Sequence, residues 1–318
     1  MPDNPQTPMA PWFPLSDHRL VALSGRDAVA FAHAQTMNDV AALADGEWHW
    51  NGWLTPKGRV IALFALLRLD TDTVWLVLPD ADADAFIAQL RRFVFRSKVT
   101  IALRDDLRVT GRLQASVLAS GNHFVSDFST GHAIETVPET IELEMSGELG
   151  ADHPGRSMRI GPALEMPLDG IDMEHSDLKK SGPEQWRRAD LEHGWPRLDA
   201  SQAEQWTPQQ LSLERLRAYS VKKGCYPGQE IVARTHFLGQ AKRGLARVRS
   251  AAPLAPGAEL VAGDAKLGTV ISTAGDIALA VASLDLLDAA LQTNESPAGG
   301  GASWNTWSIQ PLRTGLAR

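Results

Sequence analysis

The sequence is nearly free of cysteine, because Cys225 is the only one among 318 residues. A single cysteine excludes an intrachain disulfide, so nothing in the chain indicates an oxidising compartment. It also excludes the sets of thiolates that hold structural zinc ions or iron–sulfur clusters. The nine histidines are scattered without metal-ligand spacing, and we therefore expect no metal site.

The chain also lacks an excess of basic charge and any long apolar run. Its net charge is −7 and its pI is near 5.7, which argues against a nucleic-acid-binding surface. The longest apolar run, Val60 to Leu67, is far shorter than the ~20 residues that span a bilayer. The proline-rich start has no apolar segment of the kind found in signal peptides. We expect a cytoplasmic protein with no membrane and no direct nucleic-acid partner.

The composition is that of an ordinary globular chain, with 44% hydrophobic and 22% charged residues. A chain of 318 residues is expected to divide into two or three domains. Strand-like and helix-like patterns alternate to about residue 185. After Lys242-Arg243, short apolar stretches are separated by glycines, which is typical of a small antiparallel barrel or sandwich. The residues alone therefore predict a mixed α/β region followed by an all-β region.

Local signals predict several individual elements, while the interval 120–180 gives no clear pattern. Turn and cap residues mark the element ends. The predicted elements are a flexible, proline-rich stretch at 1–15, an alanine-rich helix from Arg26 to about Thr36, a hairpin over 46–69 that turns at Thr55–Gly58, and a helix over 208–219 that begins with the capping box Thr207–Gln210.

The segment from Lys222 to Glu230 gathers uncommon residues around the single cysteine. Gly224 and Gly228 allow a tight or left-handed backbone and a close approach to a ligand. Pro227 suits the first turn of a following helix. A helix N-terminus and two upstream lysines each lower the pKa of a thiol, which favours a reactive cysteine. The alternative is a buried structural cysteine in a glycine–proline turn.

The stretch Lys-Gly-Cys-Tyr-Pro-Gly-Gln-Glu, residues 223–230, resembles the signature of the YgfZ family. These are folate-binding proteins related to the T-protein (aminomethyltransferase) of the glycine-cleavage system and implicated in iron–sulfur protein maturation. T-proteins keep the lysine, glycine and aromatic frame but usually lack the cysteine. Further stretches similar to the family are Gly25–Ala28, Gln35–Val40, Thr55–Val60, Ser97–Val99, Trp186–Pro196 and Pro208–Gln209, and the matches span residues 18 to 243.

The resemblance implies an α+β fold arranged as a T-protein-like, three-lobed ring. Residues 16–240 would form a folate-binding module of two interleaved α+β lobes, roughly 16–50 with 130–240, and 51–129. Residues 241–318 would form a C-terminal antiparallel β-barrel, and residues 1–15 a flexible N-terminus.

The resemblance also implies tetrahydrofolate, or a derivative, as the ligand. Trp186 would stack on the pterin ring, and Glu192 would accept hydrogen bonds from its donor edge. His18 stands where the family often has a tryptophan that lines the folate site. Asn38 and Asp39 are further pocket candidates. Without the resemblance, Trp186 would be assigned to the core, Glu192 to the surface, and Asn38-Asp39 to a helix end.

Within the signature, Cys225 is the predicted reactive group and Lys223 the residue that tunes it. The other candidates are charged or hydrogen-bonding groups near the expected folate site. They are Tyr226, Gln229, Glu230 and Arg234. Lys222, Lys223 and Arg234 would otherwise be solvated charges, but near a folate site they are suited to a polyglutamate tail.

The predicted function is tetrahydrofolate binding in support of iron–sulfur cluster assembly or repair, including the maintenance of tRNA-modifying enzymes. The implied partners are folate and iron–sulfur assembly or client proteins, and we expect a monomer. One alternative is a folate-dependent aminomethyl or one-carbon transferase, with its catalytic aspartate among Asp80, Asp82 and Asp84. Another is a folate-independent thiol enzyme in which His236 activates Cys225. The sequence assigns no turnover.

Overall fold

The computed structural model describes most of the chain as two compact units. One unit consists of residues 1–16 and 106–186, and the other of residues 17–105 and 187–318. The described residues are 11–114, 124–127, 140–145, 155–162, 177–198, 200–239, 241–262, 265–292, 298–299 and 307–312.

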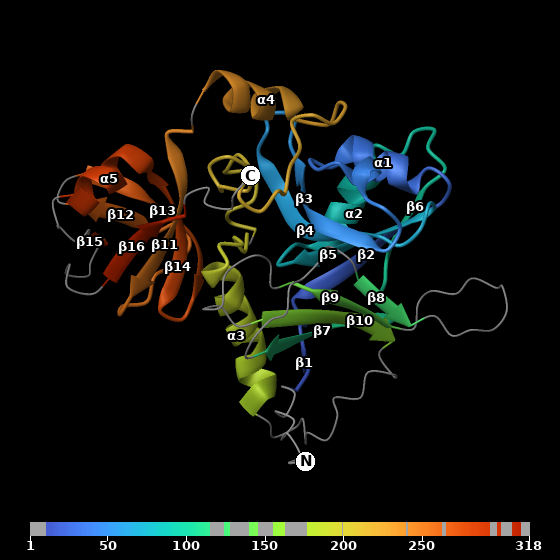
Figure 1. Cartoon of the computed structure of the whole chain (residues 1–318), viewed down its shortest axis with the longest axis horizontal. Coiled ribbons are helices and arrows are strands. Elements are labelled where there is room, and N and C mark those ends of the chain that lie inside the picture. The colour runs from blue at the N-terminus through green and yellow to red at the C-terminus, as the bar shows by residue number, and fades with distance from the viewer. Residues whose placement is uncertain are drawn as a thin grey trace, which may run out of the picture. The chain divides into compact units, whose positions relative to one another are not determined.

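The first unit is an antiparallel sheet that joins a strand from the start of the chain to strands from its middle (Figure 1). Its order is β1-β7-β10-β9-β8, and β7 pairs with both β1 and β10. The strands are β1 (Phe13–Pro14), β7 (Leu107–Gln114), β8 (Phe124–Asp127), β9 (Thr140–Glu144) and β10 (Gly155–Pro162), followed by α3 (Asp177–Glu192), whose last residues belong to the second unit.

The N-terminal stretch expected to be flexible is ordered where it is described. Phe13 and Leu15 are only 3% and 1% exposed. The Phe13 ring lies edge-on to Trp186, with centroids 6.4 Å apart. Phe13 and Leu15 are ordered because their side chains pack in the core of the first unit. The composition of residues 1–15 alone did not predict this packing. Residues 1–10 lie outside the described residues.

The second unit begins with an antiparallel sheet of order β3-β4-β5-β2-β6. Alternate side chains of β4 face opposite sides: Phe64 and Leu66 pack with α1 and α2, whereas Leu63 packs in a second core. The elements are β2 (His18–Ser24), α1 (Ala28–Gln35), the 3₁₀ turn η1 (Val40–Ala42), β3 (Glu47–Leu54), β4 (Val60–Arg68), β5 (Thr73–Pro79), α2 (Ala83–Arg91) and β6 (Thr100–Leu103).

The C-terminal part of this unit is all antiparallel, with the order β15-β12-β13-β14-β11-β16. It follows α4 (Gln229–Leu238) and carries α5 (Leu284–Gln292), as the orange and red segments of Figure 1 show. The antiparallel β-region predicted after Lys242-Arg243 is therefore confirmed, but it also contains the helix α5, which the sequence analysis did not predict. Its strands are β11 (Arg243–Ser250), β12 (Glu259–Ala262), β13 (Ala265–Ala274), β14 (Ile277–Ser283), β15 (Ala298–Gly299) and β16 (Trp307–Pro311).

The two units divide the chain differently from the predicted lobes 16–50 with 130–240, and 51–129. The reason lies in strand pairing: β2 pairs with both β5 and β6, which ties residues 17–105 into a single sheet. Residues 130–186 instead belong to the first unit.

The helix predicted over 208–219 is replaced by successive turns. Its capping box does form: the Thr207 amide donates to Gln210 Oε1 at 3.0 Å, and the Gln210 amide to Thr207 Oγ1 at 3.3 Å. Ser212 and Arg217, however, have φ values of 49° and 50°. Left-handed residues cannot continue a right-handed helix, so the segment turns instead of extending.

Two of the sequence motifs lie against each other, and glycine is required at the contact. Gly228 precedes α4 with φ of 80°. A Cβ atom on Gly228 would lie 2.6 Å from the carbonyl oxygen of Thr55 and 2.7 Å from the Cα of Gly58. The signature segment is thereby pressed against the turn between β3 and β4. Gly224 differs, because a Cβ there would meet nothing within 4 Å.

We expect Gly228→Ala to destabilise the protein and Gly224→Ala to leave it unchanged. Alanine at 228 combines a left-handed backbone with a clash against main-chain atoms, which should lower the free energy of unfolding by about 1–3 kcal/mol. Alanine at 224 should change it by less than about 0.5 kcal/mol. Urea unfolding of both variants measures the difference, and equal stabilities would contradict the contact.

Candidate functional site

In the signature loop, residues 223–228, the side chain of Cys225 is exposed, whereas Lys223 and Tyr226 on either side of it are buried. Cys225 is a free, exposed thiol. Lys223 and Tyr226 are only 5% and 6% exposed. The residues on both sides are thus fixed while the thiol stays accessible. The alternative of a buried structural cysteine is wrong for this structure.

Lys223 is bound to the C-terminal end of α1. Its Nζ donates to the carbonyl of His33, to that of Thr36 at 2.6 Å and to that of Asn38 at 3.0 Å. These carbonyls have no partner inside the helix, and a cation is favourable at this end of the helix dipole. Burial lowers the pKa of Lys223 to about 8, with Asp39 opposing the shift. The amine of Lys223, which was predicted to make the thiol of Cys225 more reactive, therefore forms its hydrogen bonds with carbonyls at the end of α1.

Tyr226 and Gln229 hold the loop together from within. The Tyr226 hydroxyl donates to the carbonyl of Ser220 at 3.1 Å, and its ring lies 4.8 Å from Lys223 Nζ. Burial raises the pKa of Tyr226 to about 12. The Gln229 amide donates to the carbonyl of Lys223 at 3.1 Å. Both predicted ligand contacts therefore serve to brace the loop in this structure.

Asn38 connects the end of α1 to the segment before the signature. Its side-chain amide donates to the carbonyls of Trp50 at 2.9 Å and Arg217 at 2.7 Å. Asp39 caps η1 by accepting from the Ala42 amide at 3.2 Å. A helix-end role was the alternative interpretation of the Asn38-Asp39 dipeptide, and it is the role observed for Asp39.

Trp186 is a core residue of the first unit rather than an open stacking surface. It is 1% exposed. The Arg156 guanidinium lies 5.2 Å from its ring, and a Cβ on Gly111 would lie 2.7 Å from the ring's Cε3. No open face of the indole is left for a pterin, which corrects the predicted stacking role.

Glu192 forms ion pairs at the end of α3. Its Oε1 lies 3.3 Å from Arg188 and 3.4 Å from Arg249, and its side chain is 17% exposed. The carboxylate is thus a reachable acceptor that already has two cationic neighbours.

His18 belongs to an ionic cluster around Arg197 that the sequence did not reveal. His18 Nδ1 lies 2.8 Å from Asp17, and Asp17 lies 2.5 Å from Arg197. Asp80 and Asp190 also contact Arg197, at 2.5 and 2.9 Å. His18 is 7% exposed and so lines no open site.

Arg197 is fully buried, and its charge is satisfied by carboxylates from three parts of the chain. Burial opposes its protonated form, but Asp190, Asp80 and Asp17 together raise its pKa. Burial would raise the pKa of Asp17, yet His18 and Arg197 lower it far below its ordinary value. Removing one partner from such a cluster leaves an uncompensated buried charge. The backbone of Asp80 has φ of 59°, an unusual conformation that places its carboxylate in the cluster.

The remaining candidates lie at the surface. Lys222, Glu230 and Arg234 are exposed. With Cys225, they are the candidate residues in and next to the signature that solvent can reach. Among the described residues, no group of histidine, cysteine and acidic side chains is arranged to hold a metal ion. No helix in the described part of the chain is long and apolar enough to cross a membrane.

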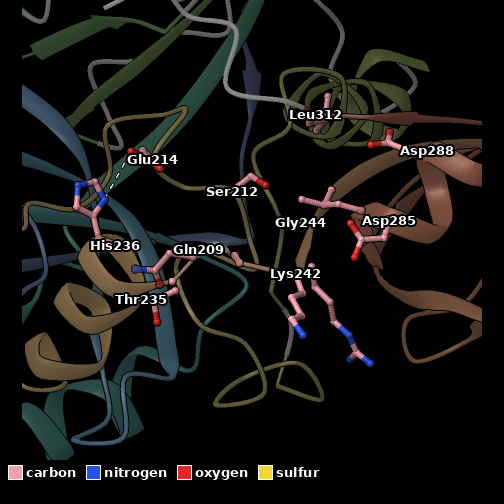
Figure 2. Close-up of a pocket in the computed structure, with 14 residues that line it drawn as sticks. Gln209, Ser212, Glu214, Thr235, His236, Lys242, Gly244, Asp285, Asp288 and Leu312 are labelled. Atoms are coloured by element: carbon pink, nitrogen blue, oxygen red, sulfur yellow. Dashed lines mark ion pairs between the residues drawn. The ribbon is translucent and has the colours of Figure 1, made fainter.

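A pocket of about 1010 Å³ opens elsewhere in the second unit. Figure 2 shows His236 and Glu214, paired at 3.8 Å, on one side and Asp285 and Asp288 of α5 on the other. Leucines Leu284 and Leu312 supply its large apolar lining residues. Its walls combine polar and apolar surface, with side chains of both charges. None of the predicted folate residues lines it, and neither does Cys225, but His236, the partner of Cys225 in the thiol-enzyme alternative, does.

We expect Lys223→Met to destabilise the protein and the adjacent Lys222→Met to have little effect. Methionine at 223 removes the ammonium donor from the carbonyls of His33 and Thr36 at the end of α1, which should cost about 1–3 kcal/mol. Lys222 is exposed, so its loss should change the free energy of unfolding by less than about 0.5 kcal/mol. Urea midpoints of the two variants test this, and a stable Lys223→Met variant would show that the buried ammonium is dispensable for folding.

Comparison with known proteins identifies the C-terminal region and the fold. Residues 242–306 match the model of the CAF17 C-terminal beta-barrel domain. The crystal structure of the glycine cleavage system aminomethyltransferase T from Bartonella henselae aligns with a TM-score of 0.64 at 16% identity, over 87% of this chain and 79% of that chain. The α+β, T-protein-like fold class with a C-terminal antiparallel β-barrel is confirmed.

Curated relatives match over most of their length. The tRNA-modifying protein YgfZ of Cronobacter sakazakii is 30% identical over 236 residues, 73% of this chain and 68% of the relative. The proteins of that name from Klebsiella pneumoniae and Sodalis glossinidius are 28% and 29% identical, over 81% and 94% of this chain and 79% and 91% of their own lengths. The chain belongs to the YgfZ family.

Proposed function

We propose that this protein binds tetrahydrofolate, or a derivative, and supports iron–sulfur cluster assembly or repair in the cytoplasm through the thiol of Cys225. The observation that carries the proposal is the exposed thiol on a braced loop. Buried Lys223 and Tyr226 fix the loop on either side of it. A thiol held in this way presents its sulfur to a partner at little entropic cost.

The partners proposed for this thiol are iron–sulfur assembly or client proteins. The relatives named tRNA-modifying protein YgfZ support a link to tRNA modification. We take that link to be indirect, through the maintenance of tRNA-modifying enzymes.

The folate part of the proposal is supported by the family and by the T-protein-like fold. The predicted residues fit this ligand in part. The Glu192 carboxylate is a reachable acceptor for the donor edge of a pterin, whereas the Trp186 ring is enclosed in the core. Bound tetrahydrofolate would supply a carrier for one-carbon units, and Glu192 would orient it.

Reduced folates should bind the purified protein saturably in equilibrium dialysis. Glu192→Gln should weaken binding by about 1.5–3 kcal/mol, the range for a hydrogen bond to a charged group. Trp186→Phe is the matched control: it should lower the thermal midpoint, because it alters a packed core, and leave the folate affinity unchanged. Absence of saturable binding by the wild type would refute the folate part alone.

Cys225→Ser should fold as stably as the wild type, because the side chain is exposed, yet fail to restore iron–sulfur enzyme activities in a strain that lacks the protein. Lys242→Ala, which alters an exposed residue outside the predicted folate and thiol residues, is the control and should complement. Full complementation by Cys225→Ser would overturn the role of the thiol, whatever the folate result.

The two alternatives find less support in the geometry. For an aminomethyltransferase, two of the three candidate aspartates are engaged, because Asp80 is held by Arg197 and Asp82 caps α2. The third, Asp84, lies exposed in the first turn of α2. For a thiol–histidine enzyme, His236 pairs with Glu214 beside the pocket. Among the described residues, no hydrogen bond joins His236 to Cys225.

A further inference from the structure

The loop between α2 and β6, residues 92–99, gathers positive charge and aromatic rings in an acidic protein. From Ala85 to Arg104 there is no aspartate or glutamate, although the chain carries a net charge of −7. Phe95 in this loop is 91% exposed and Phe93 is 47% exposed. The basic residues of the stretch are Arg91, Arg92, Arg96, Lys98 and Arg104.

The base of the 92–99 loop is fixed, so the exposure of Phe95 is a property of the fold. Arg91 donates to the carbonyl of Ile101 at 2.6 Å, and the Lys98 amide donates to Asp27 at 2.6 Å. Val94 packs against the core beneath. The Phe93 ring lies edge-on to Trp53, with centroids 5.9 Å apart.

The cations of the loop are accessible. Arg92, Arg96 and Lys98 are exposed, and no ion pair to them is found among the described residues, whereas Arg19 and Arg68 pair with Asp105 and Asp45. Arg26 adds a fourth exposed cation beside the loop. Its neighbours Gly25 and Asp27 both contact Lys98, and its only ion pair in the described part of the chain is a 4.0 Å contact with Asp27.

We propose that the 92–99 loop, together with Arg26, binds a single-stranded segment of nucleic acid. An exposed phenylalanine offers a stacking face for any base, and cations on either side suit the phosphates that alternate with bases along a strand. A lipid surface would require a broader apolar face than two rings. An acidic protein would pair with the cations, but its carboxylates would make no use of the exposed ring of Phe95.

This site goes beyond the proposed function and revises one expectation from the sequence. A net charge of −7 excludes a basic surface over the whole protein, but it averages over separate regions. The α2–β6 loop is a local exception, because the exposed Phe95 and three exposed cations all lie within residues 92–98.

Fluorescence anisotropy with a labelled, unstructured 12-nucleotide RNA tests the site on the full-length protein. Binding should be saturable at low salt. Four phosphate contacts, at about 0.7 each for a single strand, predict a slope of log K against log salt of about −2 to −3. Phe95→Ala should weaken binding roughly 5- to 150-fold, the range for loss of a base-stacking ring. Arg92→Ala with Arg96→Ala should make the slope shallower by about 1.4.

Matched controls lie elsewhere on the surface. Phe237→Ala removes another exposed phenylalanine, and Lys242→Ala with Arg243→Ala removes another pair of exposed cations. Both controls should bind the RNA as the wild type does. The proposal is overturned if the wild type does not bind, or if Phe95→Ala binds equally well. It is also overturned if polyglutamate or vesicles of anionic phospholipid bind as tightly with the same dependence on Phe95.

Discussion

The arrangement around the signature depends on one buried cation, the ammonium group of Lys223 at the end of α1. Three carbonyls converge on it, so the loop that follows has a fixed origin. Tyr226 then closes the loop against Ser220, and Gly228 presses the start of α4 against the β3–β4 turn. Because each of these contacts positions the next, the outward direction of Cys225 follows from a charge that lies beneath it.

Arg197 plays a comparable part where β2 begins and β5 ends. Its guanidinium joins the residue before β2, the residue after β5 and the end of α3 through Asp17, Asp80 and Asp190. A rigid fork with five donors suits several carboxylates at once, which a lysine could not match. Both buried cations therefore connect segments far apart in sequence, and both are enclosed by groups that compensate their charge.

The sequence predicts features whose partners are close along the chain. The hairpin at Thr55–Gly58, the capping box at Thr207 and the all-β region after Arg243 all follow from local patterns. Features that depend on distant partners were missed. The role of Arg197 cannot be predicted from its neighbours in the chain, because its partner Asp80 lies 117 residues away. Similarly, the left-handed backbone of Ser212 ends a helix that the neighbouring residues favour.

The candidate site shows the same limit. The signature located the accessible thiol, since few other roles suit an isolated cysteine in that setting. It did not distinguish side chains that face a ligand from those that support the loop, because Lys223, Tyr226 and Gln229 have the same chemistry in either role. Trp186 was misassigned for a related reason: a tryptophan's sequence context does not show which of its faces is covered.

The pairing of β1 with β7 has a consequence for how the chain folds as it is synthesised. Phe13 and Leu15 leave the ribosome long before β7 does, and at roughly 5–20 residues per second the wait is on the order of 10 s. The sheet of β2 to β6 is local in sequence and can form during that interval. The apolar start of the chain must therefore remain unpaired beside a finished sheet, without joining its edge, until its own partner has been made.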